Sequence, residues 1–355
     1  MTQSLVVGVD AGATSTRVAV HALDGTRLGY ARAGAGNPSA HGLAKAVAAI
    51  GTALEAALGP HDGARVVASL AGVAGHVEEM EPELAKVWAG HGISEGPRYV
   101  GDVPIAYAAG SPEPDGSLLL SGTGAVAARI VGYELDVIAD GLGWLLGDEG
   151  SGFWIGRAAA KAVIEALDRG LPVEALTPGA PVAGPGPGAP VAGPGPGVPV
   201  EAVGPAKEER ARGGGLLAAL VGEHFLGGER PATPRAAADR IVRLAQADHM
   251  RLAALSALVS QAAAEGDPMA AEIVREAAGH LVATLRRVHV SGPVVLAGSV
   301  LTSDGPVRQA VVELLAGETV TTAGDAAGAA AWLAARDLLP AADARARHAA
   351  FTVGR

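Results

Sequence analysis

VVGVDAGATSTRVAV, residues 6–20, is the segment that decides the fold. Its two halves belong to apolar, β-branched runs at residues 5–10 and 16–22, and a short turn around Gly12 separates them. β-Branched residues favour strands, and glycine and small polar residues favour tight turns. The chain is therefore predicted to begin with an antiparallel strand, turn and strand.

The turn between these strands has the composition of a phosphate-binding loop. It offers backbone amides and the hydroxyl groups of Thr14, Ser15 and Thr16, which a hairpin directs toward one point. Asp10 ends the first strand, where its carboxylate is placed to hold a divalent cation. A dinucleotide fingerprint is excluded because no GxGxxG opens a helix here, and a Walker loop because no lysine of the chain follows a glycine. Taken alone, the segment fits an ordinary hairpin equally well.

Outward from this hairpin, the sequence predicts two similar α/β units. Asp24-Gly25 is a hairpin signal before a third strand. The first unit continues with a helix at 42–58, a strand at 65–70, a helix at 78–90 and a strand that ends near residue 100. The second unit has strands at 117–121, 125–131 and 135–138, a helix at 152–169, helical segments from 232 to 289 and a strand at 293–297. The recurrence favours a duplicated fold.

Residues 171–206 interrupt the second unit. The nonapeptide APVAGPGPG occurs twice in tandem, at 180–188 and 189–197. Proline and glycine at this density form neither a helix nor a sheet ladder. We favour a flexible surface insert, and a polyproline segment that binds a partner is the alternative. Residues 325–339 are alanine-rich, which favours a helix that returns to the first unit.

Composition excludes several classes of function. The chain has 355 residues, enough for two hydrophobic cores. It contains no cysteine, which excludes disulfides, thiolate metal sites, cysteine nucleophiles and cysteine-held iron–sulfur clusters. The net charge of −10 and the lack of a basic cluster argue against nucleic acid as a partner. No apolar run approaches the roughly 18 residues that cross a bilayer, and no secretory leader is recognisable, so we expect a cytoplasmic protein outside membranes.

A second glycine-rich segment, GLGWLLGDEGSGFWIGR at residues 141–157, indicates a ligand site. It places two adjacent carboxylates, Asp148 and Glu149, between Trp144 and Trp154. Glycine allows backbone to approach a ligand closely, and acids beside aromatic rings suit a small polyol. A structural turn ahead of an amphipathic helix is the alternative.

Three motifs occur in an order that carries a family resemblance. They are the turn after Asp10, SGTG at 121–124 between two apolar strands, and AGSV at 297–300 at the end of a buried strand. This order is similar to that of the phosphate 1, phosphate 2 and adenosine motifs of the sugar kinase, Hsp70 and actin ATPase superfamily. Within it, GDEGSGFWIGR resembles the BadF/BadG/BcrA/BcrD-type N-acetylglucosamine and glucosamine kinase family, in particular the glucosamine kinases of high-G+C bacteria. The likeness covers nearly the whole chain except the insert.

The resemblance implies an α/β fold with two RNase H-like (actin-like ATPase) domains. Each would be a mixed β-sheet flanked by helices, with a central cleft between the domains. The N-terminal domain would comprise residues 1–115 and 323–345, and the C-terminal domain residues 116–322 with the flexible Pro/Gly-rich insert at 171–206. A homodimer is expected.

The resemblance also assigns site residues. Asp102, in YVGDVPIAYAAG, matches the family's catalytic aspartate, a general base for the sugar 6-hydroxyl. A helix N-cap before a turn at Pro104 explains the same residue without catalysis. The expected sugar-site residues are Asn37, Ser69, Gly72, Gly143, Asp148 and Glu149. The expected nucleotide-site residues are Gly12, Ala13, Thr14, Ser15, Thr16, Gly122, Thr123, Gly124, Gly298 and Ser299, with Asp10 on the metal.

Several of these residues also have plain structural interpretations. Asn37-Pro38 alone is typical of a turn, and Gly298 of a strand-to-helix connection. Glu149 either orients Asp148 or reaches the substituent on sugar C2.

Together these assignments predict a kinase that uses ATP and Mg²⁺ and phosphorylates the 6-hydroxyl of an amino sugar. Asp148 and Glu149 allow either substituent at C2. The resemblance to the glucosamine kinases of high-G+C bacteria implies glucosamine first and N-acetylglucosamine second. The ATP-driven activators of radical dehydratases share the family, but they need cysteine-bound iron–sulfur, which a chain without cysteine cannot provide. A non-catalytic ATP- and sugar-binding sensor would need a helix-turn-helix extension, and none is expected before Leu5.

Overall fold

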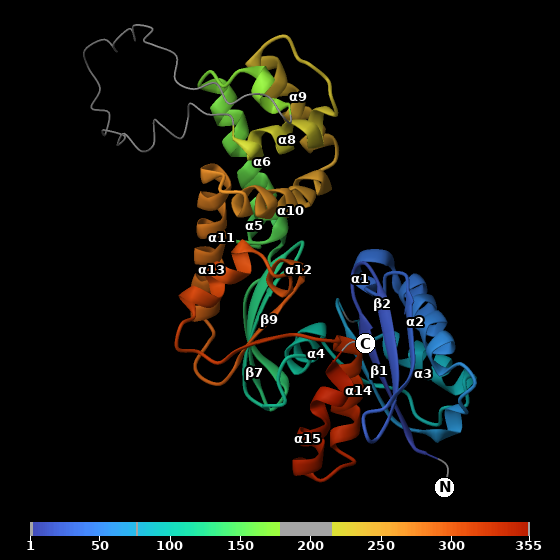
Figure 1. Ribbon diagram of the computed structural model, residues 1–355. Helices are drawn as coiled ribbons and strands as arrows, with labels where there is room; N and C mark the ends of the chain where they lie inside the picture. The colour runs from blue at the N-terminus through green and yellow to red at the C-terminus, as the bar shows by residue number, and fades with distance from the viewer. Residues whose placement is uncertain (1–2, 76, 178–214, 354–355) are drawn as a thin grey trace, which may run out of the picture.

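The computed structural model describes residues 3–75, 77–177 and 215–353. Two five-stranded mixed sheets form the centres of two lobes (Figure 1). The strand order is β3-β2-β1-β4-β5 in the first sheet and β8-β7-β6-β9-β10 in the second, so the two sheets share one topology. This repetition confirms the predicted α/β class and its two mixed sheets flanked by helices.

Parallel strand pairs bring several strand ends to one edge of each sheet. The strands of the first sheet are β1 (Leu5–Ala11), β2 (Thr16–Ala22), β3 (Arg27–Ala33), β4 (Val66–Val73) and β5 (Arg98–Val100). Those of the second are β6 (Gly116–Ser121), β7 (Ala125–Val131), β8 (Glu134–Asp140), β9 (Val294–Ala297) and β10 (Val320–Thr322). In each sheet the first three strands form antiparallel hairpins, and the other two run parallel to the first strand.

Side chains of β1 alternate between two separate cores. Val7 and Val9 belong to the core that β1 shares with α2 (Leu43–Leu58) and α3 (Met80–Gly90). Val6 belongs to the core on the opposite face, with α4 (Asp102–Ala108) and α14 (Ala326–Arg336). Since side chains of a strand alternate with a period of two, Asp10 lies on the same face of β1 as Val6.

The end of the chain returns to the first sheet. Figure 1 shows α14 and α15 (Ala341–Thr352) on the opposite side of β1 from α2. Gly8 permits the close contact with α14, because a Cβ there would lie 2.1 Å from the carbonyl oxygen of Ala327. An ion pair of 2.9 Å between Arg27 and Asp325 fixes the start of α14 beside β3. The returning segment therefore packs on the first lobe as far as Thr352.

Helices extend the second lobe away from its sheet (Figure 1). They are α6 (Gly152–Asp168), α8 (Leu216–Leu226), α9 (Pro234–Ala247), α10 (Met250–Ala264), α11 (Pro268–Arg286) and α13 (Pro306–Leu314). Phe225, Ile241 and Leu281, from three of these helices, are buried in one core that also includes residues of β6 and β7. This shared core makes the helices and the sheet one lobe.

The structure adds α4, α8, α13, α15 and β10 to the predicted elements, together with the short helices at residues 38–41, 63–65, 143–146 and 299–302. Pro104 suggested a turn, but proline is tolerated in the first turn of a helix, where its missing N–H has no intrahelical partner. The predicted insert, 171–206, begins with the short helix η2 (Val173–Leu176), and Leu171 and Leu176 are buried. The rest of it, from residue 178, lies outside the described residues.

Within the described ranges, no helix has both the length and the apolar surface to span a bilayer.

Candidate active site

Three parallel strands of the first sheet end at the same level and bring two carboxylates to one edge. Asp10 on β1 lies opposite Gly72 on β4, which in turn lies opposite Val100 on β5. Asp102 follows two residues later, as the first residue of α4. Ligands of open α/β sheets bind at the carboxyl ends of strands. Asp10 and Asp102 therefore lie at the edge where a ligand is expected.

Asp10 is paired with a residue that the sequence analysis missed. Arg17 Nη1 donates a hydrogen bond to Asp10 Oδ2 at 2.8 Å, and the two residues lie opposite each other on β1 and β2. The Asp10 side chain is 14% exposed, whereas that of Arg17 is 42% exposed. Burial raises the pKa of Asp10, Arg17 lowers it, and the charge of Asp102 raises it. The two carboxylates are thus close enough to influence each other. The position of Arg17 opposite Asp10 in the predicted hairpin is the signal that could have found it.

Asp102 has the surroundings of a proton acceptor. Burial raises the pKa of Asp102, and hydrogen bonds from its own N–H and from that of Val103 lower it. A carboxylate with a raised pKa is a stronger base. The sequence also allowed Asp102 to be a helix N-cap. In the structure the N-cap of α4 is Gly101, and Asp102 is the first residue of the helix.

The turn between β1 and β2 is a tight hairpin tip. The N–H of Gly12 donates to the carbonyl oxygen of Ser15 at 3.0 Å, and Ala13 and Thr14 are exposed. Thr16 is fully buried, and its Oγ1 has no hydrogen-bond partner among the described residues. The turn therefore offers its backbone and the hydroxyl of Thr14 to a ligand. The Thr16 hydroxyl is buried in the lobe, and its contact with phosphate stays a prediction.

The second lobe has a matching arrangement at the ends of β6 and β9. These strands are parallel neighbours, so the turn at 122–124 and Gly298 lie at the same edge. Gly298 has a φ of +80°, and a Cβ there would lie 2.3 Å from the carbonyl oxygen of Ser121. The hydroxyl of Ser121 donates to the carbonyl oxygen of Gly150 at 3.0 Å. Thr123 and Ser299 are exposed. The structure thus brings together three segments that the sequence analysis singled out separately.

Asp148 links the glycine-rich segment 141–157 to the turn at 122–124. Its Oδ1 accepts a hydrogen bond from the N–H of Gly143 at 3.3 Å, and a Cβ at Gly124 would lie 2.7 Å from its Oδ2. Asp148 is 9% exposed, and its φ of +58° is uncommon for a residue other than glycine. Burial raises the pKa of Asp148, the N–H groups of Gly143 and Ala125 lower it, and the charge of Asp140 raises it.

Asp140, another residue that the sequence analysis missed, orders the backbone of this segment. Its Oδ1 accepts from the N–H of Asp148 at 2.7 Å, and its Oδ2 accepts from the N–H of Glu149 at 2.9 Å. The Glu149 carboxylate is directed to α11, where its Oε2 lies 3.6 Å from His280 Nδ1. An acid before Gly141, at the end of a predicted strand, is the signal for such a turn-closing residue.

Asn37 lies beside the first hairpin. It is the N-cap of α1 (Pro38–His41), and its Oδ1 accepts from the N–H of Ala40 at 3.0 Å. His41 Nε2 lies 2.8 Å from the carbonyl oxygen of Ala13, and the hydroxyl of Ser39 donates to the loop after β4. The short helix α1 therefore joins the hairpin tip to the end of β4, and the amide NH₂ of Asn37 is left as a donor.

Ser69 and Gly72 both lie on β4 but differ in position. Ser69 Oγ accepts from Trp88 Nε1 at 2.9 Å in the core beneath the sheet. It precedes Gly72 by three residues, about 10 Å along a strand. The Ser69 hydroxyl is buried and bound to α3, and the contribution of Ser69 to the sugar site through its backbone stays a prediction. Gly72 lies at the edge, where a Cβ would come 2.3 Å from Ile105 of α4, so it allows α4 and Asp102 to approach β4.

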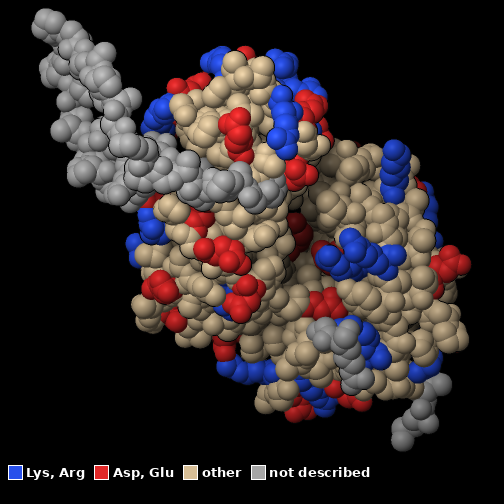
Figure 2. All heavy atoms as spheres, turned by 45° about the horizontal axis from the view of Figure 1, so that its top comes forward, with Lys and Arg blue, Asp and Glu red and all other residues tan. Residues whose placement is uncertain are grey.

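A hollow separates the two lobes on the surface. Figure 2 shows acidic side chains inside this hollow and a basic patch on its rim. Each lobe carries one tight turn of glycine and small residues at the carboxyl edge of its sheet, at 12–16 and 122–124. A bound molecule with a long anionic group could contact backbone N–H groups of both turns.

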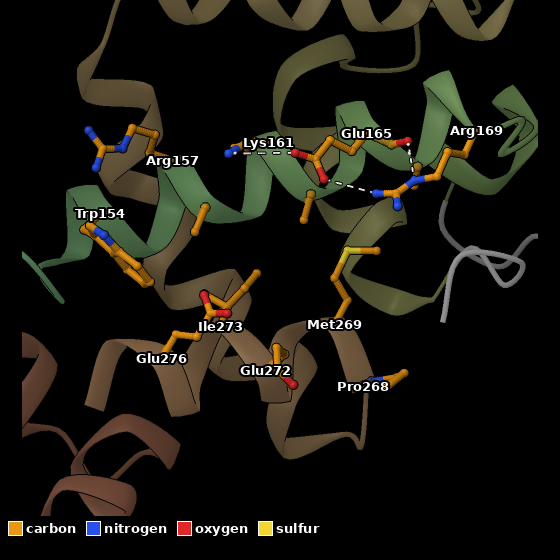
Figure 3. Close-up of a pocket in the computed structure, with 13 residues that line it drawn as sticks. Trp154, Arg157, Lys161, Glu165, Arg169, Pro268, Met269, Glu272, Ile273 and Glu276 are labelled. Atoms are coloured by element: carbon orange, nitrogen blue, oxygen red, sulfur yellow. Dashed lines mark hydrogen bonds and ion pairs between the residues drawn. The ribbon is translucent and has the colours of Figure 1, made fainter. Parts of the chain in front are cut away.

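A separate cavity of about 500 Å³ lies between α6 and α11 (Figure 3). Lys161 of α6 and Arg169, which follows this helix, both pair with Glu165 along the wall of the cavity. Met269 and Ile273 of α11 line the opposite side. None of the predicted site residues lines this cavity. It is therefore distinct from the edge that holds Asp10 and Asp102.

Comparisons with known proteins agree with this fold. A solved structure of a candidate N-acetylglucosamine kinase of Chromobacterium violaceum is 23% identical to the chain, covers 93% of it and 99% of its own length, and gives a TM-score of 0.61. The solved structure of a second candidate N-acetylglucosamine kinase, from Porphyromonas gingivalis, is 20% identical to the chain. It covers 90% of this chain and 93% of its own length, and its TM-score is 0.54. An N-acetylmuramic acid/N-acetylglucosamine kinase of Clostridium acetobutylicum is 36% identical over 70 residues, which span 20% of this chain and 23% of the relative.

A family model extends over almost the whole chain. It describes the BadF/BadG/BcrA/BcrD ATPase family and matches residues 7–332. The matched range includes the turns at 12–16 and 122–124, both carboxylates of the first sheet edge, and Gly298. The chain belongs to the BadF/BadG/BcrA/BcrD ATPase family.

Proposed function

We propose that this protein is an ATP-dependent amino sugar kinase that phosphorylates the 6-hydroxyl of glucosamine, with N-acetylglucosamine as the alternative substrate. One observation carries the proposal: each lobe has a tight turn of glycine and small residues at the carboxyl edge of its sheet, and Asp102 lies at the edge of the first. Two such turns suit the phosphates of one nucleotide, and the neighbouring carboxylate suits the alcohol that receives the phosphoryl group.

In the proposed reaction, Asp102 accepts the proton of the sugar 6-hydroxyl. The oxygen O6 forms a bond to the γ-phosphorus, and the bond from that phosphorus to the β,γ-bridging oxygen breaks, so ADP leaves with the electron pair. Burial raises the pKa of Asp102, which increases its affinity for the proton in transit. Catalysis would otherwise depend on positioning and on stabilising the charge of the phosphoryl group.

Asp10 fits a role in holding Mg²⁺. Its carboxylate is largely buried at the end of β1, beside the hairpin turn. Among the described residues no group of three or more His, Asp or Glu side chains could hold a metal ion by itself. Mg²⁺ commonly takes one or two carboxylates, waters and substrate phosphates as ligands, so a single aspartate beside a phosphate site suffices. When bound, Mg²⁺ would neutralise charge on the phosphate oxygens.

The sugar would lie between Asn37 of the first lobe and the segment 141–149 of the second. The amide NH₂ of Asn37 would donate to a hydroxyl group, and the carboxylate of Asp148 would accept from one. Gly143 would contribute by its position, since its N–H orients Asp148. We propose residues 1–115 with 323–345 and residues 116–322 as the two domains, whose closure would exclude water from the transfer.

The Asp148→Ala variant is expected to bind sugar at least about tenfold more weakly. The N–H groups of Gly143 and Ala125 lose the carboxylate that accepts their hydrogen bonds, and the sugar hydroxyl loses its acceptor as well. Isothermal titration calorimetry with glucosamine and N-acetylglucosamine measures the affinity. Asp136→Ala is a matched control, since Asp136 is an acid of β8 that pairs with Arg129 on the surface. Equal sugar affinity in Asp148→Ala and Asp136→Ala would remove Asp148 from the sugar site.

Initial rates at saturating MgATP with glucosamine, N-acetylglucosamine and glucose test the substrate. The proposal expects the highest kcat/KM with glucosamine, and a preference for N-acetylglucosamine would select the alternative substrate. Absence of phosphorylation with all three sugars, combined with intact nucleotide binding, would favour a non-catalytic sensor.

We also propose that the protein forms a homodimer. The edge strand β8 exposes Leu135, Val137 and Ile138, and apolar residues on an unpaired edge are a surface that a second copy could cover. Light scattering coupled to size-exclusion chromatography measures the mass, and a monomeric mass at micromolar concentration would contradict this proposal.

A further inference from the structure

Asp10 is the first member of a charged row that crosses three strands. In the sheet register Asp10 lies opposite Arg17, and Arg17 lies opposite Arg32 on β3. Residues directly opposite on neighbouring strands lie on the same face of a sheet. One acid and two arginines therefore share the face of the first sheet on which α4 and Asp102 lie.

Arg17 is the arginine of this row that contacts the site. It donates one hydrogen bond, from Nη1 to Asp10 Oδ2 at 2.8 Å, and its side chain is 42% exposed. A guanidinium group has five N–H donors in a planar fork, and this fork matches phosphate oxygens. Arg17 can therefore keep or exchange its contact with Asp10 and still donate to a phosphate group at the hairpin tip.

The proposed site holds two carboxylates beside the place of the γ-phosphoryl group. Asp10 would be occupied with Mg²⁺ in its proposed role, whereas the carboxylate of Asp102 would repel the phosphoryl oxygens. The turns at 12–16 and 122–124 contain no lysine or arginine, so their contribution is limited to N–H and hydroxyl groups. Arg17 follows the first turn directly and supplies a full charge.

We propose that Arg17 is a catalytic residue that donates N–H groups to the γ-phosphoryl oxygens as the group passes from ATP to the sugar. Its pairing with Asp10 is the resting arrangement of the site without nucleotide. The inference rests on the proposed kinase function and adds a residue to it. Because charge stabilisation acts in the transition state, the loss of Arg17 reduces kcat more than it reduces nucleotide affinity.

The test compares Arg17→Ala and Arg17→Lys with the control Arg32→Ala, which removes the exposed arginine one strand farther from Asp10. We expect kcat of Arg17→Ala to fall by about 10²- to 10³-fold. We expect two other quantities to change by less than about fivefold. They are the affinity for adenylyl imidodiphosphate with Mg²⁺, measured by calorimetry, and the Mg²⁺ concentration that gives the half-maximal rate. Arg32→Ala is expected to match the wild type in all three measurements.

Chemical rescue separates a direct role from a positioning role through Asp10. Guanidinium chloride at a concentration well below that which unfolds the protein is expected to restore part of the kcat of Arg17→Ala, compared with the same concentration of NaCl. If Arg17→Ala does not fold, Arg17→Lys decides, since it keeps the charge but loses the planar fork; a fall in kcat of about tenfold is expected.

Three results would overturn the inference: kcat of Arg17→Ala within about threefold of the wild type, a loss confined to nucleotide affinity, or no response to guanidinium. A kcat of Arg17→Lys within about twofold of the wild type would also overturn the inference. Failure of the proposed function is distinguishable, because the wild-type protein itself would then phosphorylate none of the amino sugars.

Discussion

Asp102→Asn is expected to lower kcat by about 10²-fold or more while leaving the affinity for MgATP nearly unchanged. The variant removes the proton acceptor but keeps the size and position of the side chain at the start of α4. Its folded state is expected to be at least as stable as that of the wild type, because burial raises the pKa of Asp102 and a neutral amide costs less to bury than a carboxylate. Steady-state kinetics and thermal unfolding measure the two effects.

The pH profile gives a second measurement of the same role. A base must be deprotonated to act, so kcat/KM for the sugar is expected to fall as the pH decreases through the pKa of Asp102, which lies above the ordinary value of 3.8. In Asp102→Asn this acid limb should disappear from the residual activity. Asp24→Asn is the control, because Asp24 is exposed in the turn before β3, far from the strand edge, and its loss should leave kcat unchanged. A kcat of Asp102→Asn within about threefold of the wild type would exclude Asp102 as the base.

Gly298→Ala is expected to lower the affinity for adenylyl imidodiphosphate by about tenfold or more and to cost about 3 kcal/mol of stability. The added Cβ would lie 2.3 Å from the carbonyl oxygen of Ser121 and 2.9 Å from the N–H of Gly122, and both are backbone atoms of the second turn. The φ of +80° at Gly298 is a further cost for any residue with a side chain. Calorimetry and denaturant unfolding measure the two losses.

Gly279→Ala is a matched control, for which the expected change in stability has the opposite sign. Gly279 lies on the exposed face of α11, where a Cβ would meet nothing within 4 Å. Gly279→Ala is therefore expected to stabilise the protein by up to about 1 kcal/mol and to leave nucleotide affinity unchanged. If Gly298→Ala behaves like Gly279→Ala, the close contact between the β9 end and the second turn is not part of the nucleotide site.

Local pattern was sufficient to predict most of the fold. The hairpins β1–β2 and β6–β7 have apolar runs around short turns that contain glycine, and α2 and α6 have clear amphipathic spacing. The two hairpins and the two helices could therefore be identified without tertiary information. The three-residue strand β10 and the seven-residue helix α4 could not, because their formation depends on the sheet beside them more than on their own composition. Pro104 in particular has opposite meanings in a turn and in a first helical turn.

The candidate site was predictable at its strand ends and less so elsewhere. Asp10 lies near the end of β1, and Asp102 and Gly298 follow β5 and β9, so their positions at sheet edges follow from topology. The buried position of the Ser69 hydroxyl could not be predicted, because spacing along β4 does not reveal which face a side chain uses. Arg17 was missed because its partner lies across the hairpin, and only the register between β1 and β2 places the two side chains together.

A crystal structure of the protein with adenylyl imidodiphosphate, Mg²⁺ and glucosamine tests the central claim most directly. The account predicts that the triphosphate contacts both the β1–β2 turn and the β6–β7 turn, with sugar O6 within hydrogen-bond distance of Asp102 and about 3–3.5 Å from the γ-phosphorus. A triphosphate bound away from both turns, or a sugar whose O6 faces away from Asp102, would contradict it.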